Sequence, residues 1–144
     1  MFTLLKKQVS VNVSLNAPSE LTAIAKLAGF AGMKLDLANQ ELRSGFLASE
    51  AQGSHVVAAH IAVTHASSAN VQTPQTVIMS FDAPIAWGED QHIDLLVAVI
   101  VPTTADTEAV LAQMLTGVQQ QAAALDAAKA HAGALEKVRR QLLG

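Results

Sequence analysis

The chain has 144 residues, no cysteine and a net charge of −3 at neutral pH. This length suits one domain, residues 1–144, with its own core, and the lack of cysteine excludes disulfides and thiolate chemistry. The acidic balance argues against a nucleic-acid-binding protein, which would carry a basic surface. No stretch reaches the ~18 consecutive apolar residues of a membrane span, and the start lacks the order of a signal peptide. We therefore expect a cytoplasmic domain that does not insert into a membrane.

The first third of the chain predicts one strand and two helices. Apolar and polar residues alternate over residues 10–15, which predicts a strand. Asn16 offers a capping side chain, with a proline two residues later, so a helix is predicted to begin there. Gly29 and Gly32 are predicted to end it. A second helix is predicted over residues 38–52.

Three β-rich segments follow. Residues 56–63 are short, apolar and β-branched, which is typical of a buried strand. Residues 76–81 predict a second strand, and residues 92–101 a third, which Pro102 ends. Residues 82–90 contain Pro, Gly and Asp and predict a turn.

The last third predicts helices only. One begins near Thr104, the Ala- and Gln-rich residues 119–130 continue as helix, and Gly133 is predicted to separate them from a last helix. Helices, then strands, then helices in one small domain imply an α/β fold, a single mixed β-sheet flanked by helices on both faces.

Several kinds of site can be excluded from the residues alone. No glycine-rich phosphate loop precedes a helix, so nucleotide binding has no motif. No histidine pair has metal-ligand spacing and the acidic residues do not cluster around a histidine, so we expect neither a metal nor a cofactor. Ser44-Gly45 and Gly53-Ser54 lack the turn motif of a serine hydrolase.

One of the five histidines stands out. His92 and His131 are interpreted as surface residues, and His60 as a half-buried, hydrogen-bonded side chain in an apolar strand. His65 directly follows the predicted strand, at the end where open α/β sheets bind ligands, and small polar residues follow it. Because imidazole is reactive near neutral pH, His65 is the candidate functional residue.

A longer stretch supports this choice. Residues 59–66, Ala-His-Ile-Ala-Val-Thr-His-Ala, resemble the segment Gly-Ile-Ala-Ile-Pro-His-(Gly/Ala) around the phosphorylated histidine of the mannitol/fructose enzyme IIA family of bacterial sugar phosphotransferase systems. Residues 46–50 fit the end of that family's second helix, which reads Leu-x-Arg-Glu. The family's second strand, its Pro-Ile-x-(Trp/Phe)-Gly loop and its third strand resemble residues 71–81, 83–88 and 92–102.

The resemblance implies that His65 is a phosphoryl carrier. It would accept the group from an HPr-like donor protein and pass it to an enzyme IIB domain. Neutral imidazole is a competent nucleophile, and phosphoryl transfer needs mainly positioning and charge neutralisation. Backbone N–H groups of a small-residue turn at Ala66 and Ser67 would suit phosphate oxygens.

Departures from the family leave a second function open. Ser49 stands where the family has arginine, and Glu108 or a neighbour stands where it has a second histidine. His60 and Thr64 replace the motif's glycine and proline. The supporting candidates are Ser49, His60, Thr64, Ala66, Ser67 and Glu108. The retained His65 favours a working carrier, whereas the departures favour a degenerate regulatory module that docks with weak or no phosphotransfer.

Overall fold

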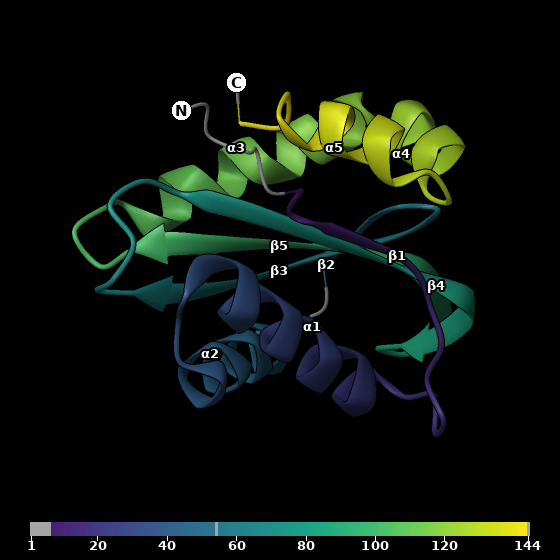
Figure 1. Ribbon diagram of the computed structural model, residues 1–144, viewed down its shortest axis with the longest axis horizontal. Helices are drawn as coiled ribbons and strands as arrows, with labels where there is room; N and C mark the ends of the chain where they lie inside the picture. The colour runs from purple at the N-terminus through teal and green to yellow at the C-terminus, as the bar shows by residue number, and fades with distance from the viewer. Residues whose placement is uncertain (1–6, 54, 144) are drawn as a thin grey trace, which may run out of the picture.

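The computed structural model describes residues 7–53 and 55–143, with residue 55 described for its backbone only, and has a mixed sheet between two layers of helices (Figure 1). The strands are β1 (Val9–Val13), β2 (His55–Ala58), β3 (His60–Ser68), β4 (Gln75–Trp87) and β5 (Gln91–Pro102). The helices are α1 (Glu20–Leu35), α2 (Asn39–Ala51), α3 (Thr107–Gln120), α4 (Ala122–Ala128) and α5 (Ala132–Arg139).

The sheet has the strand order β1-β4-β5-β3-β2. β1 runs parallel to β4 and β3 parallel to β5, while the β4–β5 and β2–β3 pairs are antiparallel. Figure 1 shows α1 and α2 on one face and the last three helices on the other. Both faces of the sheet therefore bury apolar side chains, in two separate clusters. This confirms the predicted mixed sheet flanked by helices on both faces.

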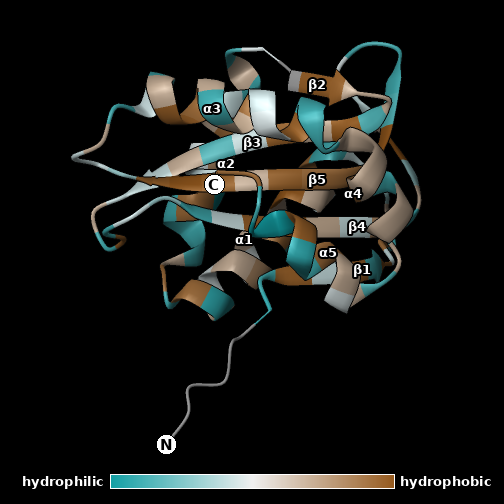
Figure 2. Ribbon diagram, turned by 90° about the horizontal axis from the view of Figure 1, so that it is seen from above, coloured by the Kyte–Doolittle hydropathy of each residue, from teal (hydrophilic) through white to brown (hydrophobic). Residues whose placement is uncertain are grey.

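β5 is the middle strand, and its sequence shows why. Its run of apolar residues is buried almost throughout, as expected for a strand that is covered on both faces. Figure 2 shows β5 as a hydrophobic band through the centre of the sheet. None of the helices in the described part of the chain combines the length and apolar character needed to cross a membrane.

The start of α1 and its glycines differ from the sequence prediction. The helix is capped at Ser19 and not at Asn16, through a capping box with Thr22. It also continues through Gly29 and Gly32 to Leu35, so the prediction that these glycines end it is wrong. A Cβ at Gly32 would lie 2.8 Å from the carbonyl oxygen of Leu37. Gly32 therefore allows the segment that follows α1 to pack closely against the helix.

The predicted strand over residues 56–63 is also wrong, because these residues form two strands. β2 and β3 are joined by a tight turn at Ala59, and His60 has a left-handed backbone with φ +67°. His65 therefore lies within β3 and does not follow a strand end. Ala66 and Ser67 are likewise strand residues, so they do not form the small-residue turn that was expected.

Other boundaries shift as well. β4 continues through residues 82–87, which were predicted as a turn, with an irregularity in its pairing between Ser80 and Ile85. The real turn follows Trp87. In the last third, the helical region breaks at Gln121 and before α5, and Gly133 lies inside α5.

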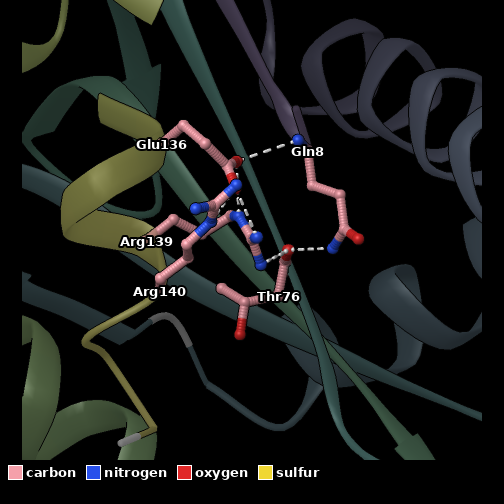
Figure 3. Close-up of polar contacts among 5 residues, drawn as sticks. All are labelled: Gln8, Thr76, Glu136, Arg139 and Arg140. Carbon is pink, nitrogen blue, oxygen red and sulfur yellow. Dashed lines mark hydrogen bonds and ion pairs between the residues drawn. The ribbon is translucent and has the colours of Figure 1, made fainter. Parts of the chain in front are cut away.

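A buried polar network ties α5 to the first strand (Figure 3). Glu136 is 3% exposed and accepts hydrogen bonds from the backbone N–H of Gln8 at 3.0 Å and from both Arg139 and Arg140. Arg139 and the Gln8 side chain also donate to the carbonyl of Thr76. Burial opposes ionisation of Glu136, but these hydrogen bonds and the arginine charges outweigh it and lower the carboxyl pKa to about 2.

Candidate functional site

The site forms where the edge of β3 becomes open. β5 pairs with β3 along its length, but β2 covers only the part of the other edge up to Val63. Beyond Val63, α2 takes the place of a strand. A Cβ at Gly45 would lie 2.6 Å from that of Ala66, so the helix lies directly on β3 because this residue has no side chain.

Ser49 and His65 meet at this edge. The backbone N–H of His65 donates to Ser49 Oγ at 3.3 Å, which satisfies a strand amide that has no neighbouring strand. The same oxygen lies 2.9 Å from Nδ1 of the imidazole. Ser49 is only 1% exposed, while the His65 side chain is partly exposed. One buried hydroxyl thus fixes both the backbone and the ring of His65.

Of the residues next to His65 in β3, some are buried in the core and others are exposed. Thr64 is fully buried and its hydroxyl donates to the Phe46 carbonyl of α2 at 3.4 Å. Ala66 is buried against α2. Ser67 is exposed, and since N–H groups of alternate strand residues point the same way, its N–H lies on the same open edge as that of His65.

Two predicted supporting residues lie on other parts of the fold. His60 begins β3, five residues or ~16 Å along the strand from His65. It borders a hollow of about 250 Å³ together with Ala122 and Asp126. Glu108 is exposed in the first turn of α3, a helix capped by Asp106. A supporting role for either residue stays a prediction.

Sequence reasoning missed a carboxyl directly beside the Ser49–His65 pair. Glu50 follows Ser49 in α2 and accepts a hydrogen bond from Nε1 of Trp87 at 3.0 Å. Its second oxygen, Oε2, is buried without a hydrogen-bond partner among the described residues. Glu20 of α1 lies nearby and accepts from the backbone N–H of Gly88 at 2.9 Å. The two carboxyls together hold the end of β4 and the turn after it.

The surroundings of Glu50 favour its neutral form. Burial raises the pKa of this carboxyl to about 7, and the negative charge of Glu20 adds to the effect. The Thr64 hydroxyl and the Trp87 indole act in the opposite direction but are outweighed. The signal in the sequence was the glutamate of the Leu-x-Arg-Glu resemblance, together with a tryptophan that would need a partner for its N–H when buried.

The described residues contain no group of three His, Asp or Glu side chains placed to hold a metal ion. The groups that the structure brings together at this site are a partly exposed imidazole, a buried hydroxyl and a neighbouring carboxyl.

Solved structures with the same fold include phosphotransferase-system proteins. The nitrogen regulatory protein IIA-Ntr of Neisseria meningitidis superposes with a TM-score of 0.71 at 17% identity, covering 94% of this chain and 93% of that one. Enzyme IIA mannitol of Escherichia coli gives 0.69 at 15% identity, covering 98% and 99%. The complex of this enzyme with phosphorylated enzyme IIB mannitol gives 0.69 at 15% identity, covering 99% and 98%.

At these identities the structures show a shared fold. Comparison with the curated proteins finds no match. The family model described as phosphoenolpyruvate-dependent sugar phosphotransferase system, EIIA 2, matches residues 4–135, which is most of the chain. The chain therefore belongs to the EIIA 2 family of the phosphoenolpyruvate-dependent sugar phosphotransferase system.

Proposed function

We propose that the protein is a phosphoryl carrier of the mannitol/fructose class, which accepts the group on His65 from an HPr-like protein and passes it to an enzyme IIB. One observation carries the proposal. In a member of this family, a partly exposed histidine is held at the open edge of β3 by a buried hydroxyl on its Nδ1. The exposed ring is within reach of another protein.

The hydrogen bond to Ser49 selects the reacting nitrogen. In the tautomer that reacts, Nδ1–H donates to Ser49 Oγ and the lone pair is on Nε2. The Nε2 lone pair forms the new bond to phosphorus, and the electron pair of the broken P–N bond returns to the donor's nitrogen. A hydroxyl can accept from Nδ1–H before transfer and donate to Nδ1 after the phosphorylated, cationic ring has released that proton to solvent, so one side chain serves both states.

The partners follow from the family and from one related structure. Enzyme IIA mannitol of Escherichia coli forms a complex with phosphorylated enzyme IIB mannitol, and this chain shares that enzyme's fold. An enzyme IIB is accordingly the proposed acceptor. With this role we propose a cytoplasmic location for the protein, as expected from the sequence.

Incubation with phosphoenolpyruvate, enzyme I and HPr tests the proposal. Intact mass should show one added phosphoryl group, which acid removes and base does not, as expected for phosphohistidine. His65→Ala should abolish the addition, whereas His92→Ala, an exposed histidine at the start of β5, should leave it unchanged. A phosphoryl group that survives acid, or that persists in His65→Ala, would place the modification on another residue and refute the proposal.

A second function is favoured by the identity of residue 49. The family's arginine is a serine here, so position 49 does not supply a cation that would neutralise the phosphoryl charge. The protein would then act as a regulatory module that docks on a partner; the structure from Neisseria meningitidis that shares this fold is described as a nitrogen regulatory protein. If only Ser49→Arg takes up phosphate, the docking module is supported; if the wild type is fully phosphorylated, it is excluded.

A further inference from the structure

Glu50 has two features that the proposed carrier mechanism leaves unexplained. Its side chain is partly buried beside the site, with the oxygen Oε2 shielded from solvent, and its other oxygen accepts from the indole of a fully buried tryptophan. Its hydrogen bond goes to the Trp87 indole, so the carrier mechanism as proposed gives it no step of its own. We propose that Glu50 is a positioning residue, which anchors the last turn of α2 on Trp87 and so keeps the Ser49 hydroxyl on His65. The positioning role itself does not depend on the proposed function; only its expected effect on phosphorylation of His65 does.

The first step of the argument is the place of Glu50 on the helix. Ser49 and Glu50 are consecutive in the last turn of α2, so their side chains point about 100° apart. Ser49 contacts the edge of β3, whereas Glu50 contacts the end of β4. The turn is thereby fixed in two directions at once, and neither contact can shift without moving the other.

The second step is the weakness of this helix end on its own. α2 has no basic residue in its last turn, and Gln52 and Gly53 close it through backbone N–H groups that donate to Ser49 and Glu50 carbonyls. Terminal turns fray unless side chains hold them. Phe46 anchors the preceding turn in the core, but beyond it the Glu50–Trp87 bond is the contact that holds the turn against β4.

The third step concerns charge. The charged group that acts on Glu50 from a packed element is Glu20 of α1, while β3 and β4 present the uncharged Thr64 and Trp87. Because Glu20 is also an acid, ionisation of both carboxyls places like charges together at the Trp87–Gly88 end of β4. A proton on Glu50 removes this repulsion and leaves both hydrogen bonds to that segment in place.

This anchoring should respond to pH near neutrality. The pKa of Glu50 is raised from 4.5 to about 7, so between these values the folded protein holds a proton that the unfolded chain has released. Its contribution to stability therefore declines as pH rises from about 4.5 through about 7. The last turn of α2 should be firmest on the acid side of neutrality and loosest above it.

Two measurements test the proposed effect of Glu50 on His65 without any phosphoryl donor, one on the Trp87 ring and one on the backbone of His65. Trp87 is the chain's one tryptophan, so its indole N–H gives a single NMR signal that reports ionisation of Glu50. Amide hydrogen exchange at His65 reports the bond to Ser49 Oγ. Glu50→Gln keeps an acceptor for the indole and removes the charge, Glu50→Ala removes the acceptor, and Glu89→Gln on the exposed turn is the matched control.

In the wild type, the indole signal should titrate with a midpoint near 7, and exchange at His65 should accelerate above that pH beyond the intrinsic rise. Glu50→Gln should lose both effects. Glu50→Ala should accelerate His65 exchange by roughly tenfold or more at all pH values, because local opening then costs less. If Glu50→Ala does not fold, Trp87→Phe removes the indole N–H and should accelerate exchange in the same way. Unchanged exchange at His65 in the folded variants overturns the proposal.

Phosphorylation is measured separately on the same variants. Glu50→Ala should slow phosphorylation of His65 roughly 10- to 100-fold, as small misplacements of a reacting group do, and Glu50→Gln should restore the rate without its pH dependence. Glu89→Gln should match the wild type in both assays. If no variant is phosphorylated but exchange follows the pattern above, the carrier function fails and the positioning role stands. If Glu50→Ala is phosphorylated like the wild type with unchanged exchange, the positioning role fails and the carrier function stands.

Discussion

Glu136→Gln should remove most of the stabilisation that the polar network in Figure 3 contributes. Lowering the Glu136 pKa from 4.5 to about 2 corresponds to about 3 kcal/mol in favour of the folded state at neutral pH. Glutamine keeps one oxygen acceptor but has no charge and no second acceptor for Arg139 and Arg140. Breaking one side of a buried charge network costs a similar amount, about 3–5 kcal/mol. For a chain of this length, the melting temperature should fall by roughly 10 °C.

The pH dependence gives the sharper test. Because the folded pKa of Glu136 is depressed, its contribution is complete above about 4.5 and is lost as pH falls through about 2. The difference in unfolding free energy between wild type and Glu136→Gln should thus shrink from about 3 kcal/mol at pH 7 to about 2 kcal/mol near pH 3.5.

Urea unfolding followed by the fluorescence of the buried Trp87 measures this difference directly. Glu89→Gln on the exposed turn controls for the loss of a carboxylate and should lie within ~0.5 kcal/mol of wild type. A difference for Glu136→Gln below about 1 kcal/mol at pH 7, or one that stays constant down to pH ~3, would refute this account of the network.

Three further substitutions test local packing, two of them at the site and one in α5. Ser49→Ala should cost about 1–3 kcal/mol in unfolding free energy, because the His65 N–H loses its acceptor; a loss under ~0.5 kcal/mol in urea unfolding would argue that the hydrogen bond contributes little. Gly45→Ala should cost about 1–3 kcal/mol and move α2 away from β3, since the added Cβ would meet that of Ala66 at 2.6 Å. Gly133→Ala, in a helix and facing open space, should raise stability by about 0.5–1 kcal/mol in the same assay, and a loss there would contradict the open surroundings.

The central strand of the sheet could be predicted from its amino-acid composition. β5 is an unbroken apolar run, and such a run fits a strand that is buried on both faces. The hairpin that contains His65 was not predictable in the same way. Its turn at Ala59 and His60 contains none of the Gly, Asn, Asp or Pro residues that are typical of turns. Residues 56–63 therefore had the sequence pattern of one continuous strand.

The site was predictable in its central residue but not in its contacts. His65 was identified through resemblance over a short segment, and Ser49 was noted as a missing arginine. That the two side chains lie 2.9 Å apart depends on how α2 crosses the open edge of β3, across 16 residues of sequence. Glu50 was overlooked because an isolated glutamate near a helix end has the pattern of a solvated side chain. Only the tertiary packing of Trp87 against it shows otherwise.

The hydrogen bond between Gln8 and Glu136 has a consequence for how the chain folds and opens. It joins residues 128 positions apart, and β1, which follows Gln8, pairs with β4 alone. An edge strand held by such distant contacts completes its pairing late, because closing so long a loop must wait for the rest of the sheet. β1 and α5 should accordingly detach together as one cooperative unit, well below the free energy of global unfolding. Native-state amide exchange should then show the amides of β1 and α5 losing protection in one step, while those of β3 and β5 stay closed.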